Sequence, residues 1–301
     1  MHSWLKYLLM YAALCATALA QSLVVTNKAD GKVWVEAKGA AGVSHTLQVS
    51  ADLHFWTDLN SSITDAYSIE LTNNWGATKY FRLLPTGPDP DPIRVAIIGD
   101  SLSSDCCGWG GGIHSYFKPA ATVVNYALPW TSTKVFLQSA EYDKLTLIKP
   151  NYVLIQFGWF DGSGDPDRSA TPSEFAANLR TIVDVVRGFN GVPILVTVHA
   201  ARNWDGNGNL IPSDHPYNAI TKQVAAEVNT PVIDLYKLTS ELFGKMGKSG
   251  CEFMIFAPFG PDDTMHFSYL GGVYVSQTIV NALPDALAPY LIGNLERPPL
   301  P

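Results

Sequence analysis

The chain has 301 residues, with 20 Lys and Arg against 27 Asp and Glu, a formal net charge of −7 and 47% hydrophobic residues. This composition supports a folded core, so it excludes disorder as the main state. The acidic balance excludes a general nucleic-acid binder, which needs basic surface to neutralise phosphates, but it is compatible with a carbohydrate partner.

Residues 1–20 have the pattern of a secretory signal peptide. Lys6 precedes an almost wholly apolar stretch, and Ala18 and Ala20 form a small-x-small cleavage site before Gln21. The apolar stretch is too short to span a membrane in the mature protein. We therefore expect a secreted protein, extracellular or periplasmic, with no membrane partner; a retained N-terminal anchor is the less favoured interpretation.

Residues 21–85 carry the signature of short β-strands. Polar and apolar residues alternate in four stretches, 32–37, 45–49, 67–71 and 78–84, with turn residues between them. Strands at this spacing predict a small all-β sandwich. Trp56 and Trp75 could stack on sugar rings there, although a place in the core is favoured. Four prolines from Pro85 to Pro92 then predict a stiff linker over residues 86–92.

After the linker, residues 93–289 alternate between strands and helices. Continuous apolar runs, typical of parallel strands buried on both faces, occur at 94–98, 121–125, 152–156, 193–198 and 231–235. Thr171 and Glu174 form a capping box that starts a helix ending at Gly188. Further helices are expected over 219–228 and 272–283. The pattern predicts a three-layer α/β/α sandwich with a parallel sheet, followed by a C-terminal tail over 290–301.

Residues that follow the strands are the first place to look for chemistry, because ligands bind beyond the carboxyl ends of parallel strands. Ser101 follows the first strand, in the block Gly99–Asp100–Ser101. Its hydroxyl needs a base, and His266, before the last helix, is the candidate. Asp263 can reach the other imidazole nitrogen from the same loop. Each pattern alone is common, but the two together favour nucleophilic catalysis.

These residues resemble the GDSL, or SGNH, hydrolase family, and within it the rhamnogalacturonan acetylesterase-like carbohydrate esterases. The resemblance covers about residues 93–285 and includes Asn125-x-Ala127, Gln156–Phe157–Gly158, Arg202-x-Trp204 and Ile233–Asp234–Leu235. It implies an SGNH hydrolase-like α/β/α sandwich that removes acyl groups, often acetyl, from polysaccharide. It also implies that Ser101 is the nucleophile, His266 the base and Asp263 the acid of a serine esterase.

Two positions of the family's oxyanion hole differ in this chain. The family uses the serine N–H, a glycine N–H and an asparagine side chain, and here Trp130 stands at the glycine position and Phe160 at the asparagine position. The backbone N–H groups of Ser101 and Trp130 are the expected donors, whereas a Phe side chain donates nothing. Loss of one such donor typically lowers turnover by about 10²–10³. The enzyme could be slow or specialised, or another donor could substitute: Trp159, Trp204, Asn203 or Arg202.

Aromatic residues gather on the predicted active-site loops, where flat rings suit stacking on sugars. The candidate carbohydrate-binding residues are Trp130, Trp159, Phe160, Trp204 and, with less support, Trp109. Asp161 is a further substrate-binding candidate, although a structural turn carboxylate is the favoured interpretation. Asp100, Asp161 and Asp263 could share one cleft, so a carboxylate-based glycosidase or lyase is the main alternative. A sugar-binding pseudoenzyme is the other.

Three cysteines follow the signal peptide, Cys106, Cys107 and Cys251. In an oxidising compartment we expect one bridge and one thiol. Cys251 could pair with Cys106 or Cys107, which would tie two active-site loops together; a vicinal Cys106–Cys107 bridge and metal ligation are less favoured. No His lies at a zinc-like spacing, so neither a metal nor a cofactor is predicted. The sequence carries no signal of an oligomeric state.

Overall fold

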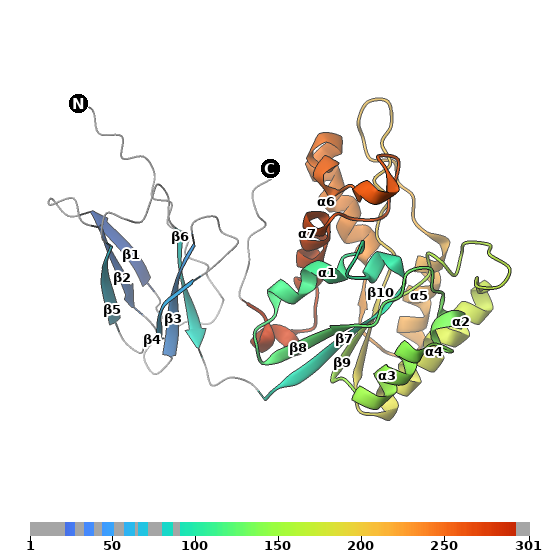
Figure 1. The fold of residues 1–301 in the computed structure, drawn as a ribbon, viewed down its shortest axis with the longest axis horizontal. Helices are drawn as coiled ribbons and strands as arrows, with labels where there is room; N and C mark the ends of the chain where they lie inside the picture. Colours follow the sequence, from blue (N-terminus) through green and yellow to red (C-terminus); the bar gives the residue numbers. More distant parts are fainter. Residues whose placement is uncertain are drawn as a thin grey trace. The chain divides into compact units, whose positions relative to one another are not determined.

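The computed structural model describes six strands between Ser22 and Thr86 and the continuous stretch 91–292. The chain divides into two compact units, before and after the Asp89–Pro90 bond, and Figure 1 draws both. The expected signal peptide, Trp56 and Trp75 lie outside the described residues. No helix within the described ranges is long and apolar enough to cross a membrane.

The first unit contains two antiparallel sheets of three strands each. One has the order β1 (Ser22–Asn27), β2 (Val33–Lys38), β5 (Ala66–Leu71), and the other β4 (Thr57–Ile63), β3 (Ser44–Ser50), β6 (Tyr80–Thr86). The four stretches of alternating residues fall on β2, β3, β5 and β6. Val35, Leu47 and Phe81 are buried, as inward positions of alternating strands should be. The packing of the two sheets into a sandwich stays a prediction.

The second unit is built on a parallel sheet of five strands, in the order β11-β10-β9-β7-β8. They are β7 (Ile93–Gly99), β8 (Ala121–Asn125), β9 (Tyr152–Gln156), β10 (Val192–Val196) and β11 (Val232–Ile233). Each continuous apolar run therefore forms a strand. The last strand is shorter than expected, because Asp234 leaves it and caps the next helix by accepting the N–H of Lys237.

Helices cover both faces of this sheet (Figure 1). One face carries α1 (Gly110–Ile113), α6 (Leu235–Gly250) and α7 (Tyr269–Val280). The other carries α2 (Thr133–Phe136), α3 (Ala140–Ile148), α4 (Pro172–Gly188) and α5 (Pro216–Glu227). Side chains of β7 alternate between the faces: Val95 and Ile97 pack into the first core, and Ala96 and Ile98 into the second. The α/β fold predicted from the sequence, with a parallel sheet between helices, is confirmed.

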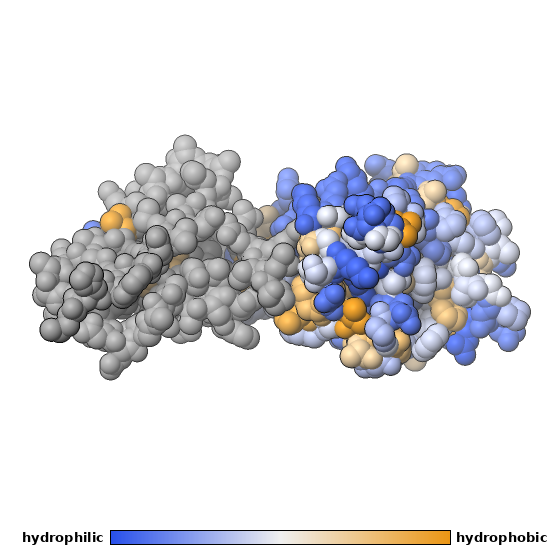
Figure 2. Space-filling view, turned by 90° about the horizontal axis from the view of Figure 1, so that it is seen from above, coloured by the Kyte–Doolittle hydropathy of each residue, from blue (hydrophilic) through white to orange (hydrophobic). Residues whose placement is uncertain are grey.

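The capping box predicted for α4 is present. Thr171 Oγ1 accepts the N–H of Glu174, and the Glu174 carboxylate accepts the N–H of Thr171 at 2.8 Å. Helix α6 was not predicted, although Leu235, Thr239 and Phe243 are buried at helical spacing. On the face of this unit that Figure 2 shows, hydrophilic residues predominate and hydrophobic ones are scattered among them, so the apolar side chains are mostly inside.

Two glycines let the backbone of α7 come close to the backbone of α1 and of the turn just before it. A Cβ atom at Gly112 would lie 2.5 Å from the Cα of Val273, and one at Gly272 would lie 2.7 Å from the carbonyl oxygen of Gly108. Neither site has room for a larger residue. Since α1 follows the Ser101 turn and α7 follows the His266 loop, this contact joins the two segments that carry the candidate catalytic residues.

Candidate active site

Ser101 lies in the tight turn after β7, at the carboxyl edge of the sheet. Asp100 caps the short helix Ser101–Ser103, its Oδ1 accepting the N–H of Leu102 at 3.0 Å. The hydroxyl of Ser103 donates to the carbonyl oxygen of Asp100, which holds the turn further. The side chain of Ser101 is thereby left at the surface of a cavity while its neighbours are buried.

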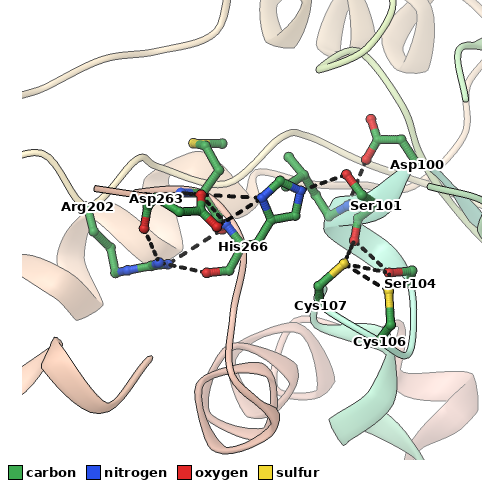
Figure 3. Close-up of polar contacts among 10 residues, drawn as sticks. Asp100, Ser101, Ser104, Cys106, Cys107, Arg202, Asp263 and His266 are labelled. Carbon is green, nitrogen blue, oxygen red and sulfur yellow. Dashed lines mark hydrogen bonds and ion pairs between the residues drawn. The ribbon is translucent and has the colours of Figure 1, made fainter. Parts of the chain in front are cut away.

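The structure brings together the three residues that the sequence singled out (Figure 3). Ser101 Oγ lies 2.9 Å from His266 Nε2, and His266 Nδ1 lies 3.1 Å from Asp263 Oδ2. Asp263 Oδ1 also accepts the backbone N–H groups of Met265 and His266, at 3.0 and 3.1 Å. A hydroxyl, an imidazole and an orienting carboxylate within hydrogen-bond reach can perform nucleophilic chemistry with general-base assistance.

Arg202 holds the loop that carries Asp263 and His266. Its Nη2 donates to the carbonyl oxygens of His266 and Asp263, at 2.7 and 3.2 Å (Figure 3). The guanidinium lies 4.8 Å from the centre of the Phe267 ring. Burial lowers the pKa of Arg202 to about 10, and the Asp263 carboxylate opposes this shift, so the group stays charged at neutral pH. Sequence reasoning considered Arg202 only as an oxyanion donor and missed this role.

A cavity of about 610 Å³ opens beside Ser101 and His266. Besides these two, its lining consists of Cys106, Cys107, Pro129, Trp130, Trp159, Phe160, Gly162, Ser163, His215, Phe256, Pro258 and Phe259. Three predicted aromatic residues, Trp130, Trp159 and Phe160, are therefore present in the wall. Phe256 and Phe259 were missed, because nothing in the sequence showed that their loop folds over the site. Phe259 meets the His266 imidazole edge-on, with ring centres 4.7 Å apart.

Two of the five predicted aromatic residues lie elsewhere. Trp204 borders a small pocket on the other side of Asp263, together with Arg202 and Cys251, and packs against the core. Trp109 is fully buried, and its indole N–H donates to Gln156 Oε1 at 3.1 Å. The expectation that Trp204 binds substrate in the Ser101 cavity is thus corrected, because its ring is used for packing.

Asp161 was also a candidate substrate-binding residue, and the structure corrects this expectation. Its side chain is 1% exposed and does not line the cavity. Oδ1 accepts the N–H and the hydroxyl of Thr133, at 2.9 and 2.5 Å, and Oδ2 accepts the N–H of Gly158 at 3.2 Å. Burial raises the pKa of Asp161 to about 6, and these hydrogen bonds oppose the shift. The structural interpretation of this carboxylate is therefore the right one.

Asp100 is fully buried as well. Burial raises its pKa to about 7; the N–H of Leu102 opposes this shift, and the nearby Asp161 carboxylate adds to it. Its Oδ2 has no hydrogen-bond partner of good geometry, although the N–H of Phe160 lies close enough to lower the pKa. No pair of carboxylates lines the cavity among the described residues. The geometry thus gives no support to a carboxylate-based glycosidase or lyase.

Trp130 has an unusual backbone conformation, with a φ of 64°. This left-handed region is one that glycine adopts freely and that other residues enter at a cost of about 1–2 kcal/mol. The resemblance noted above places Trp130 at a glycine position of the family, and its backbone here is glycine-like despite the large side chain. That side chain is 61% exposed and meets the Phe160 ring edge-on, with centres 6.1 Å apart.

The predicted bridge between Cys251 and one of the other cysteines is not present. All three cysteines are free, and Cys251 is buried beside Arg202. The sulfur atoms of Cys106 and Cys107 instead lie 2.9 Å apart. Within the described residues, no three His, Cys, Asp or Glu side chains are grouped so that they could hold a metal ion.

Comparisons with known proteins agree with this geometry. The GDSL-like Lipase/Acylhydrolase family matches residues 97–270. The rhamnogalacturonan acetylesterase RhgT of Bacillus subtilis is 29% identical over 212 residues, which cover 64% of this chain and 90% of RhgT. The probable rhamnogalacturonan acetylesterase YesY of the same bacterium is 25% identical over 195 residues, 64% of this chain and 88% of YesY.

Among solved structures, the crystal structure of the Bacillus subtilis protein YxiM has a similar fold, with a TM-score of 0.57 and 18% identity. The match covers 87% of this chain and 82% of that one. The family match alone spans more than half of the chain and includes Ser101 and His266. The chain therefore belongs to the GDSL-like lipase/acylhydrolase family and is a hydrolase of ester bonds related to carbohydrate acetylesterases.

Proposed function

We propose that this protein is a secreted serine esterase that removes acetyl groups from carbohydrate. The observation that carries the proposal is the line of contacts from Asp263 through His266 to Ser101, which ends in an aromatic cavity. Two relatives with the name of rhamnogalacturonan acetylesterases support an acetylated polysaccharide as substrate. Secretion rests on the signal-peptide pattern of residues 1–20.

In the proposed reaction, Ser101 Oγ attacks the carbonyl carbon of the ester while His266 Nε2 accepts the hydroxyl proton. Asp263 keeps the proton of the neutral imidazole on Nδ1 and stabilises the imidazolium that forms. His266 then gives its proton to the departing sugar oxygen, and the acetyl group stays on Ser101. In the second half, His266 removes a proton from water as the water oxygen attacks the acyl carbon; His266 then returns this proton to Ser101 Oγ as the bond from Oγ to the acyl carbon breaks, and acetic acid leaves and ionises to acetate.

The oxyanion of each tetrahedral intermediate needs hydrogen-bond donors. We assign this role to the backbone N–H groups of Ser101 and Trp130, neither of which has an acceptor among the described residues. The glycine-like φ of Trp130 supports this assignment. Phe160 adds no donor, so the hole has one donor fewer than in the family. We therefore expect turnover about 10²–10³ lower than that of a family member with the asparagine.

The cavity also suggests which part of a polysaccharide it binds. Trp130, Trp159 and Phe259 are exposed at its wall, where flat rings can stack on the apolar face of a sugar. No Lys, Arg, Asp or Glu is among the described lining residues, so none of these side chains supplies a charge at the cavity wall. The buried carboxyl groups nearby, Asp100 and Asp161, cannot supply a positive charge either. Of the two histidines in the lining, His266 is the proposed base, and burial lowers the pKa of His215, which disfavours its cationic form, so a uronate would find no permanent counter-ion here. We infer that the acetylated unit in the cavity is uncharged.

Acetate release tests the proposal, with acetylated xylan as a neutral substrate and acetylated rhamnogalacturonan as an acidic one. We expect the wild-type protein to deacetylate the neutral polymer faster, and Ser101→Ala to reduce turnover by about 10⁴-fold or more. Ser115→Ala is the matched control, because the exposed Ser115 hydroxyl donates only to the carbonyl of Gly112. Full activity of Ser101→Ala would exclude the serine mechanism. Sugar binding without any turnover would instead identify a pseudoenzyme.

A further inference from the structure

Two neighbouring cysteines line the cavity beside the nucleophile. Cys106 is exposed, Cys107 is 3% exposed, and their sulfur atoms lie 2.9 Å apart. Ser104 Oγ contacts both sulfurs, at 3.2 and 3.5 Å, and donates to the carbonyl oxygen of Ser101 at 2.8 Å (Figure 3). The Cys107 thiol also donates to the Ser101 carbonyl oxygen, at 3.8 Å, so the pair is linked to the backbone of Ser101 both directly and through the Ser104 hydroxyl, and no step of ester hydrolysis uses it.

We propose that Cys106 and Cys107 are a redox modification site, at which a small-molecule disulfide such as oxidised glutathione closes a vicinal disulfide that slows the enzyme. A disulfide bond is about 2.05 Å long, so the sulfur atoms need to approach by only about 0.9 Å. Cys251, the remaining cysteine after the signal peptide, is buried beside Arg202 and does not line this cavity. The geometry therefore favours the neighbouring pair over a bridge to Cys251.

The closure takes two exchange steps with one molecule of oxidant. Cys106 loses its proton to solvent and its thiolate attacks one sulfur of oxidised glutathione, whose S–S bond breaks and releases one glutathione thiolate. Cys107 then loses its proton and attacks the Cys106 sulfur of the mixed disulfide, which releases the second glutathione thiolate. Two cysteine thiols are oxidised, one glutathione disulfide is reduced, and the two released thiolates take up two protons.

The order of the two steps follows from exposure. Cys106 can meet a soluble disulfide, because it is exposed at the cavity. Cys107 is buried, and burial together with the hydrogen bond to Cys106 raises the pKa of its thiol. Buried and protonated, Cys107 is a poor first nucleophile, but it is placed to resolve a mixed disulfide on its neighbour.

Closure of the disulfide ring should displace both the proposed nucleophile, Ser101, and the proposed base, His266. The Cα atoms of neighbouring residues are about 3.8 Å apart, less than the usual span of a disulfide, so the ring is strained and easily reduced. Closing it turns the peptide unit between Cys106 and Cys107 and thereby shifts the adjoining backbone of Cys107, whose carbonyl oxygen accepts the N–H of Phe267 at 2.8 Å. Phe267 directly follows His266. A small displacement of this kind lowers turnover by about tenfold or more.

Intact-mass measurement of the full chain after treatment with oxidised glutathione tests the proposal without relying on activity. We expect the loss of two hydrogens and one peptide in which Cys106 and Cys107 are linked. Hydrolysis of p-nitrophenyl acetate should fall about tenfold in parallel and return after dithiothreitol. In Cys107→Ser, which lacks the resolving thiol, one glutathione should stay attached to Cys106.

Cys251→Ser is the matched control and should close the ring as the wild type does. Three free thiols after treatment, a lasting mixed disulfide in the wild type, or a bridge to Cys251 would each overturn the proposed site. Closure with unchanged ester hydrolysis would overturn its effect on the enzyme. Because mass and activity are separate readouts, a protein without esterase activity would fail the proposed function while the redox site could still be shown.

Discussion

The acidic residues at the two sides of the site differ in how they are held. Asp263 lies on an accessible loop with its carboxylate against the His266 imidazole, at 3.1 Å. Asp100 and Asp161 lie beneath the Ser101 turn, buried, and accept hydrogen bonds mainly from backbone N–H groups and from Thr133. All three are short acids on loops at the carboxyl edge of one sheet. Their partners and their burial, rather than their residue type, separate the carboxylate proposed for catalysis, that of Asp263, from the structural ones.

The largest expected effect in this comparison belongs to Asp263→Asn. An amide cannot stabilise the imidazolium and can favour the wrong tautomer of His266, so kcat should fall by about 10³–10⁴ with little change in KM. Steady-state acetate release measures both constants. Asp262→Asn, at the exposed neighbouring acid, is the control and should match the wild type. An Asp263→Asn variant with wild-type kcat would contradict the assignment.

Asp161→Ala should reduce stability rather than substrate binding. The change removes the acceptor of three buried donors, the N–H and hydroxyl of Thr133 and the N–H of Gly158. We expect the free energy of unfolding to fall by about 3 kcal/mol in denaturant titrations. Asp161→Asn keeps one acceptor oxygen and should lose less. If Asp161→Ala raised KM without lowering the free energy of unfolding, Asp161 would be a substrate-binding residue after all.

Asp100 should make stability depend on pH. Burial raises its pKa to about 7 in the folded chain from an ordinary value of 3.8, so between about pH 4 and pH 7 the folded chain holds a proton that the unfolded chain has lost. The free energy of unfolding therefore falls as pH rises through this window, by at most about 4 kcal/mol for the full shift, and we expect about half of that.

Asp100→Asn removes this titration while keeping an oxygen for the N–H of Leu102. Denaturant unfolding at pH 4.5 and pH 8 should show a smaller difference in the variant than in the wild type. Part of the pH dependence should remain in the variant, because Asp161, with a pKa of about 6, still titrates there. If the free energy of unfolding depended on pH equally in the two proteins, ionisation of Asp100 would not destabilise the folded chain, which would contradict the prediction.

The features that follow from local sequence were predictable. A continuous apolar run marks a strand with two buried faces, and the capping box at Thr171 marks the start of α4, because both depend on near neighbours alone. Ser101, Asp263 and His266 were found from their places after the first strand and before the last helix. Their contacts show that chain order was enough to bring them to one edge of the sheet.

The features that depend on distant packing were not predictable. Asp161 and Trp130 both follow strands, yet one is 1% exposed and the other 61%. Helix α6 was missed because three glycines, Gly244, Gly247 and Gly250, break its pattern, and Gly247 has a left-handed φ of 69°. The Phe256–Phe259 wall was missed for a related reason: only the folded chain shows that this loop meets the imidazole.

The close approach of α1 and α7 at Gly112 and Gly272 has an evolutionary consequence. The backbone contact between these helices joins the segments that carry Ser101 and His266, and the residues that form the aromatic wall are not part of that contact. Selection can therefore remodel the wall for new polymers while the reacting atoms stay in register. Trp130, with its glycine-like backbone, and Phe259, which contacts His266, are the exceptions, so protein engineers should begin with Trp159 when they change the substrate range.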